Sequence, residues 1–96
     1  MPKGYWIVLY RSVSDPAALA RYGAKAPGVI TGRGGRILAR GMPARVYEKA
    51  EAQRCVVVEF DSVDQAIATY DSAPYQEVLS ILKGAAEREV RIVEGA

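Results

Sequence analysis

Four side chains able to do acid–base or hydrogen-bond chemistry lie close together between residues 59 and 78. They are one carboxylate, one aliphatic hydroxyl and two phenols: Glu59, Ser72, Tyr70 and Tyr75. Burial raises the pKa of a carboxylate and lets it exchange a proton near neutral pH, so Glu59 is the best candidate for a catalytic residue. The alternative is structural, because an ion pair with Arg40 on the neighbouring strand would also occupy the Glu59 carboxylate.

The hydroxyl groups also allow two interpretations. Ser72 would need a base to become a nucleophile, and the chain has no histidine, so Ser72 is better explained as the N-cap of a helix that opens at Pro74. Tyr70 and Tyr75 recur at helical spacing, which is typical of core packing. They could instead line a pocket, where a phenol offers both an apolar ring and a polar tip.

Two further features have weaker functional interpretations. The segment GRGGR, residues 32–36, resembles an anion-binding loop, but it precedes a predicted strand rather than a helix. Its glycines are better explained by positive φ angles in a tight turn. The single cysteine, Cys55, lies among valines of a predicted strand and is expected to be buried and inert.

Composition limits the class of protein. The 96 residues form one domain, residues 1–96, with 50% hydrophobic residues and a net charge of +2, which is too small to indicate nucleic-acid binding. One cysteine allows no internal disulfide and favours a reducing compartment. The apolar run near the N-terminus is too short to cross a membrane, so we expect a cytoplasmic protein. Without histidine, neither a metal site nor a cofactor is expected.

Periodicity predicts four strands and two helical regions. Apolar and β-branched runs predict strands over residues 5–13, 36–40, 54–60 and 88–95. Asp15 and Pro16 predict the start of a first helix, which Pro27 and Gly28 kink or end, with a last turn reaching Ile30. Asp61 or Ser62 caps a second helix, which Ser72-Ala73-Pro74 interrupts and Gly84 stops.

The helical stripes indicate which residues form the core. The second helical region places apolar residues at i, i+3, i+4 and i+7 in both of its parts: Val63, Ala66, Ile67 and Tyr70, then Tyr75, Val78, Leu79 and Leu82. The order β-α-β-β-α-β is that of the ferredoxin-like α+β fold, an antiparallel sheet with helices on one face.

The strands YWIVLY and CVVV are apolar on both faces, although two helices can cover only one face of the sheet. The other apolar face of the sheet therefore has no segment of this chain predicted to pack on it. We expect a second copy to cover this face, packed sheet to sheet across a two-fold axis as a homodimer with a barrel-like interior.

The chain resembles the small bacterial domain-of-unknown-function family 1330, of the dimeric α/β-barrel superfamily. The segments that carry the resemblance are YWIVLY, DPAALARY, GGRILARG, VVVEFDSVDQAIATYDSAPYQEV and the closing VEG. The resemblance implies a dimeric ferredoxin-like fold with a small cleft between sheet and helices, but no established reaction. The positions of this chain that match the family's pattern are Tyr22, Gly35, Arg40, Glu59, Phe60, Tyr70, Ser72 and Tyr75. Relatives often carry tryptophan at position 70 and arginine at position 83, where this chain has Tyr70 and Lys83.

Three functions remain open at this stage. The first is the binding of a small anionic or aromatic molecule in that cleft, with six candidate ligand-binding residues: Tyr22, Arg40, Glu59, Tyr70, Ser72 and Tyr75. The second is a cofactor-free enzyme, a proton-transfer isomerase or monooxygenase acting on a small keto or phenolic compound, which is suggested by analogy of fold alone. The third is an interaction module without a ligand.

Overall fold

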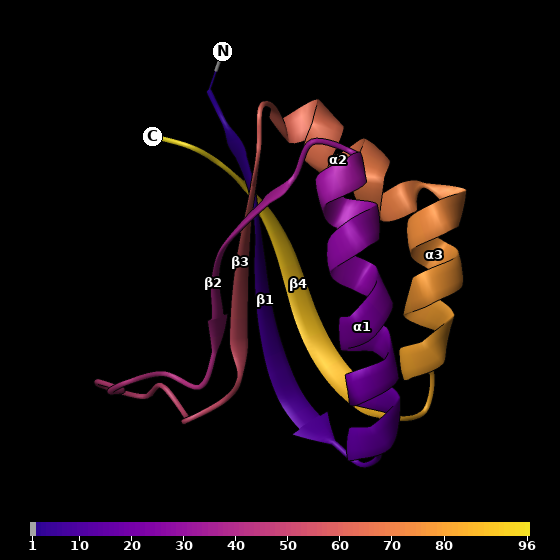
Figure 1. The fold of residues 1–96 in the computed structure, drawn as a ribbon. Helices are drawn as coiled ribbons and strands as arrows, with labels where there is room; N and C mark the ends of the chain where they lie inside the picture. The colour runs from indigo at the N-terminus through magenta and orange to yellow at the C-terminus, as the bar shows by residue number, and fades with distance from the viewer. Residues whose placement is uncertain (1) are drawn as a thin grey trace.

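The structure is a computed structural model that describes residues 2–96. A four-stranded antiparallel sheet forms one layer, and its strands are β1 (Gly4–Val13), β2 (Arg36–Gly41), β3 (Cys55–Phe60) and β4 (Ala86–Glu94), in the spatial order β2-β3-β1-β4. Helices α1 (Pro16–Gly32), α2 (Val63–Asp71) and α3 (Ala73–Leu79), with a 3₁₀ turn at Ser80–Leu82, form the second layer on one face of the sheet (Figure 1). The predicted ferredoxin-like α+β fold is confirmed.

Alternation along β1 divides the sheet into two faces. Trp6, Val8 and Tyr10 are buried under the helices, whereas the residues between them point to the other side and are half-buried. The pairing with β3 sets Trp6 opposite Val58 and Val8 opposite Val56, so the inner faces of the two strands coincide. This inner face and the helices form the core, as the apolar runs of β1 and β3 predict.

Helix α1 continues through Pro27 and Gly28 to Gly32, so of the two predicted alternatives, a kink or an end, the end at these residues is wrong. Its buried residues recur every four positions, and this unbroken apolar stripe holds the helix on the sheet across the proline: Ala18, Tyr22, Ala26 and Ile30. Thr31 Oγ1 donates a hydrogen bond to the carbonyl of Pro27 at 2.9 Å. Asp15 accepts from the amides of Ala17 and Ala18, which confirms it as the N-cap.

The helical break at Ser72 is confirmed, and it separates α2 from α3. The Ser62 hydroxyl accepts a hydrogen bond from the Gln65 amide, as the capping-box spacing predicts. The Gln65 side chain does not complete the box, because it donates to the Arg33 carbonyl at 2.7 Å. Ile67, predicted to be core, is 42% exposed, since α2 turns Ala66 and Thr69 toward the sheet instead.

The turn before β2 explains the glycines of GRGGR. Gly34 has a φ of +87°, and a Cβ at Gly35 would lie 2.5 Å from Ile30 Cγ2 and 2.9 Å from Phe60. Positive φ and close approach both favour glycine. The conformational interpretation of this segment therefore accounts for it.

Residues 42–54, which join β2 to β3, form an extended arm on the side of the sheet away from the helices (Figure 1). Within this arm Met42, Val46 and Tyr47 are exposed. None of the helices formed by residues 2–96 combines the length and the apolar character that a membrane crossing requires.

Gly4 tests how tightly α2 packs on β1. A Cβ at Gly4 would lie 2.6 Å from the Ser62 carbonyl oxygen and 2.7 Å from Val63 Cα, both backbone atoms that cannot move independently of α2. We expect Gly4→Ala to lower the free energy of unfolding by about 1–3 kcal/mol, measured by urea denaturation. The matched control is Gly28→Ala, where nothing lies within 4 Å and the helical position predicts a gain of about 0.5–1 kcal/mol. Equal stability of the two variants would contradict the packing argument.

Candidate functional site

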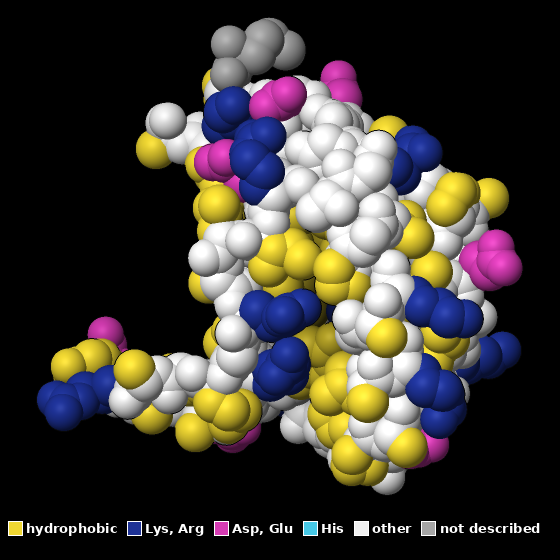
Figure 2. Space-filling model, viewed as in Figure 1, with side chains coloured by type: hydrophobic (Ala, Val, Ile, Leu, Met, Phe, Trp, Pro, Cys, Tyr) yellow, Lys and Arg dark blue, Asp and Glu magenta, His cyan; other side chains and the backbone are white. Residues whose placement is uncertain are grey.

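A cavity of about 70 Å³ lies between the inner face of the sheet and helices α1 and α3. Its lining is mainly apolar and aromatic, with three arginines from the sheet side: Arg40, Arg54 and Arg88. The lining residues contain no aspartate, glutamate, histidine or lysine. The surface view shows a hollow with an apolar floor and Lys or Arg side chains at its sheet-side rim (Figure 2). A mostly apolar concavity with a few converging polar groups is the usual form of a small-molecule site.

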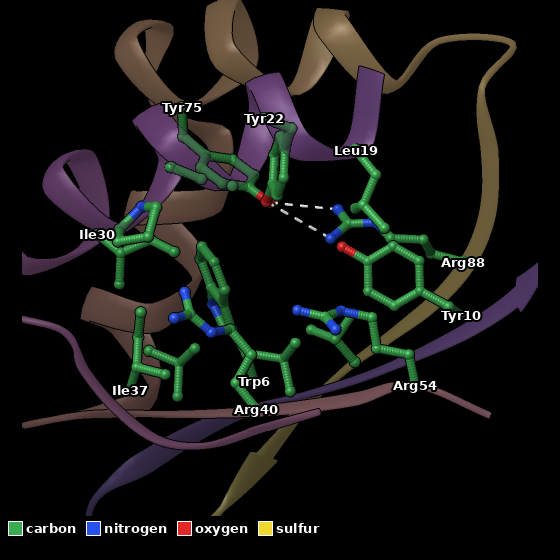
Figure 3. Close-up of a pocket in the computed structure, with 16 residues that line it drawn as sticks. Trp6, Tyr10, Leu19, Tyr22, Ile30, Ile37, Arg40, Arg54, Tyr75 and Arg88 are labelled. Carbon is green, nitrogen blue, oxygen red and sulfur yellow. Dashed lines mark hydrogen bonds between the residues drawn. The ribbon is translucent and has the colours of Figure 1, made fainter. Parts of the chain in front are cut away.

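Two of the arginines flank one tyrosine across three strands. Tyr10 of β1 pairs with Arg88 of β4, and on its other side the Tyr10 amide donates to the carbonyl of Arg54, the residue before β3. The guanidinium carbons lie 5.5 Å (Arg88) and 6.0 Å (Arg54) from the centroid of the Tyr10 ring (Figure 3). The ring therefore holds both cations by cation–π attraction.

These cations lack protein counter-ions. Within residues 2–96, no carboxylate lies within 4.0 Å of Arg40, Arg54 or Arg88. Arg54 Nε is buried, and no atom of the described residues accepts a hydrogen bond from it. Arg40 is exposed and Arg54 and Arg88 are half-buried, so the argument from burial applies to the Arg54 Nε atom, since a buried donor without an acceptor costs about 1–3 kcal/mol. The cavity lining is therefore positively charged.

Arg88 also holds a pair of buried phenols. The hydroxyls of Tyr22 (α1) and Tyr75 (α3) lie 2.5 Å apart, and Arg88 donates to Tyr75 at 3.2 Å and to Tyr22 at 3.5 Å (Figure 3). Burial raises the pKa of Tyr22 far above its usual value, with the nearby Tyr75 adding to the effect, so Tyr22 stays protonated at neutral pH. Tyr22 therefore acts as a neutral hydrogen-bonding group beside the Arg88 cation.

Packing against neighbouring aromatic rings fixes the position of the Tyr75 side chain. Its ring lies 5.0 Å from Trp6 and 5.3 Å from Tyr70, and its side chain is 1% exposed. The Trp6 indole donates to the Ala66 carbonyl at 2.9 Å, which anchors α2 to the central strand. The phenol of Tyr75 is thus rigidly held at the cavity wall.

Three of the six predicted ligand-binding residues, Tyr22, Arg40 and Tyr75, line this cavity. Arg40 reaches it because of a bulge in β2, between Ile37 and Ala39, which turns Arg40 to the inner face opposite Val56. If the same residues paired regularly, without the bulge, Arg40 would lie opposite Cys55 and point outward.

Glu59 lies on the outer face of the sheet, so both alternatives predicted for it, a buried carboxylate that exchanges a proton and an ion pair with Arg40, are wrong. The register sets Arg36 opposite Glu59, and Arg36 Nε donates to the Glu59 carboxylate at 2.9 Å. Tyr5 donates to the same carboxylate at 2.8 Å. These two hydrogen bonds, that of Tyr5 first, lower the pKa of Glu59. Glu59 is thus an ionised, paired carboxylate, remote from the cavity lining.

Tyr70 and Ser72 are positioned differently from the cavity residues. Tyr70 packs edge-on against Trp6 and borders a separate, more open groove beside β4, which Gln76, Lys83 and Arg88 also line. The Ser72 hydroxyl accepts from the Tyr75 amide at 3.3 Å and donates to the Thr69 carbonyl at 2.7 Å. Its capping role, predicted from the sequence, is confirmed.

Sequence reasoning missed Trp6, Tyr10, Arg54 and Arg88 as lining residues. The signal for three of them was present in the two-residue period of the strands. Every second residue of β1 faces inward, so the series Trp6, Val8 continues to Tyr10. The same alternation continues along β3 to Arg54 and along β4 to Arg88. Each continuation ends the apolar series with a polar residue at the same end of the sheet.

The sheet, its helical cover and the cleft between them define an α+β protein of ferredoxin-like fold. The chain belongs to the family described as a domain of unknown function, DUF1330, which it matches over residues 3–96. No relative is found among curated proteins.

Several solved structures share this fold. A protein of unknown function from Rhodopseudomonas palustris has 15% identity and a TM-score of 0.75, with 99% of this chain and 83% of that chain covered. SnoaB, a cofactor-independent oxygenase from Streptomyces nogalater, has 9% identity and a TM-score of 0.69, with coverage of 100% and 95%. A dimeric ferredoxin-like protein from Thermobifida fusca has 15% identity and a TM-score of 0.68, with coverage of 97% and 91%. At these identities the likeness shows the fold alone.

The lowered pKa of Glu59 predicts a pH-dependent stability. Because the folded pKa lies below the ordinary value of 4.5, the ionised pair stabilises the fold fully above about pH 4.5 and is lost as the pH falls through the folded pKa. We expect Glu59→Gln to lower the melting temperature at pH 7, and the difference from wild type to shrink progressively as the pH falls below about 4.5. The control is Glu94→Gln, at an exposed carboxylate of the same sheet. A difference that grows on acidification would contradict this account.

Proposed function

We propose that the protein binds a small organic anion, such as a carboxylate with an apolar body, in the cavity between the sheet and helices α1 and α3. The observation that carries the proposal is the set of arginines without a carboxylate partner in the described residues, above all the buried Arg54 Nε. A planar guanidinium suits a carboxylate because it donates parallel hydrogen bonds. The apolar lining suits the remainder of the ligand.

The cavity volume limits the ligand to a small molecule. About 70 Å³ holds several non-hydrogen atoms, enough for a short aliphatic chain or a single ring. A cofactor-free enzyme remains the alternative, and its support is the fold shared with the oxygenase SnoaB and with a putative antibiotic biosynthesis monooxygenase from Nitrosomonas europaea. The described lining offers no carboxylate, histidine or lysine as a proton acceptor, so the chemistry of the lining favours binding over proton transfer.

We also propose that a second copy covers the outer face of the sheet. The middle of this face is apolar and half-buried, with Ile7 opposite Val57 and Leu9 opposite Cys55. Ion pairs flank it at two places, Arg36–Glu59 and Arg11–Glu89. An apolar centre with a charged rim is typical of protein interfaces.

The arm of residues 42–54 supports the same interface. It extends to the outer side of the sheet and carries the exposed apolar residues Met42, Val46 and Tyr47, so a copy packed on that face would also contact the arm (Figure 1). Solved proteins of this fold from Thermobifida fusca and Bacteroides fragilis are described as dimeric.

Ligand binding can be followed through Trp6, the single tryptophan of the chain, because it lines the cavity. We expect hexanoate and benzoate to change its fluorescence and to bind more tightly, by titration calorimetry, than the neutral hexan-1-ol and benzyl alcohol. Arg54→Gln should weaken hexanoate binding by about tenfold or more, because a charge-assisted hydrogen bond contributes about 1.5–3 kcal/mol. The control is Arg21→Gln, at an exposed arginine outside the lining. Equal affinity for acids and alcohols would overturn the proposal.

The proposed dimer is tested by introducing a charged residue at the centre of the proposed interface and measuring the sedimentation of the protein. We expect wild type to sediment at twice its 10.4 kDa mass at micromolar concentration, and Ile7→Lys to sediment as a monomer because a buried lysine without a partner disfavours association. Ile67→Lys is the matched control, because Ile67 is exposed on the helical layer. A monomeric wild type, or dimeric Ile7→Lys, would contradict a sheet-to-sheet interface.

A further inference from the structure

The Tyr22–Tyr75 pair contains one hydrogen-bond donor that no described residue accepts. Each phenol has one O–H, so the pair has two protons to donate. One proton lies in the bond between the two oxygens, and either phenol can be its donor. Arg88 is only a donor, so it takes up neither proton. One O–H therefore remains free.

The free O–H is buried at the cavity wall. Tyr22 is 7% exposed and Tyr75 1% exposed, and both residues line the cavity. A buried hydroxyl without an acceptor is unfavourable, so a group inside the cavity must accept this proton. Since either phenol can donate to the other, the free proton can be offered from either oxygen.

The same geometry indicates that the Tyr22–Tyr75 pair does not need a hydrogen-bond donor from the ligand. Arg88 donates to both oxygens, and one of these oxygens also accepts from its neighbouring phenol. The pair therefore needs an acceptor rather than another donor. A carbonyl oxygen only accepts, whereas a ligand hydroxyl in this position would bring a proton that itself needs a partner.

We infer that the ligand carries two oxygen functions, a carboxylate that pairs with the cavity arginines and a carbonyl that accepts from the Tyr22–Tyr75 pair. This inference rests on the proposed function and narrows it to small oxo acids. The two recognition points are close, because Arg54 and Arg88 both lie within 6.0 Å of the Tyr10 ring centroid and Arg88 contacts both phenols. One small molecule can therefore reach both points.

The test compares hexanoate with 2-oxohexanoate, 4-oxohexanoate and 5-oxohexanoate by calorimetry on the wild-type protein. The three isomers place the carbonyl at different distances from the carboxylate. We expect at least one isomer to bind about fivefold more tightly than hexanoate, the gain that one additional hydrogen bond provides. If hexanoate binds and no isomer exceeds it, the inference is overturned while the proposed function stands. If none of the four acids binds, the proposed function fails first.

Phenylalanine variants of Tyr22 and Tyr75 test whether these phenols cause the preference for an oxo acid over hexanoate. The double variant Tyr22→Phe/Tyr75→Phe should bind hexanoate and its preferred oxo isomer equally, because both donors are gone. Each single variant leaves one O–H, so the one that loses the preference identifies the phenol that reaches the ligand. Arg54→Gln is the contrast and should weaken hexanoate and the oxo isomer by the same factor. A double variant that keeps folding, hexanoate binding and the full oxo preference would show that another group binds the carbonyl.

Discussion

The hydrogen bond from the Trp6 indole to the Ala66 carbonyl fixes the spacing between the sheet and its helical layer. It joins the first part of the inner strand β1 to α2, and the Trp6 ring also packs against Phe60, Tyr70 and Tyr75. A buried indole N–H has to find an acceptor, so the bond is both required and directional. The position of the Tyr75 phenol follows from this packing, and with it the geometry of the cavity wall.

The cavity combines an apolar interior with positive charge, and this combination decides what it can bind. In a poorly hydrated site each charged hydrogen bond is stronger than in water, but an isolated cation is also less stable there. Aromatic faces compensate for part of that cost, since Arg88 lies near both the Tyr10 and the Tyr22 ring. In the proposed function an anion provides the larger part, so the site is expected to select ligands by charge before any detail of shape matters.

The sequence predicts the fold well because its elements depend on local rules. Strand alternation, the caps at Asp15 and Ser62, and the break at Ser72 all arise from neighbouring residues, and each is found in the structure. The length of α1 was mispredicted because tertiary packing of its buried stripe outweighs the local effect of Pro27.

The site was harder to predict, because it depends on register between strands that are distant in sequence. The pairing that sets Arg36 rather than Arg40 beside Glu59 cannot be obtained from either strand alone. Strand alternation does place Arg54 and Arg88 on the inner face of the sheet. Charged residues at strand ends are usually exposed, however, so alternation alone does not identify them as cavity residues. Tyr22 and Tyr75 were recognised as candidates, yet their mutual hydrogen bond requires the packing of α1 against α3.

The bulge in β2 makes the charge of the cavity depend on strand pairing as well as on residue identity. Arg40 faces inward because one additional residue is accommodated between Ile37 and Ala39. Regular pairing of the same residues would set Arg40 opposite Cys55 and turn it to the other side, whereas deleting one residue at the bulge would remove the bulge and leave Arg40 inward. The orientation of this arginine therefore depends on how β2 pairs with β3, a dependence that comparison of aligned residue identities would not reveal.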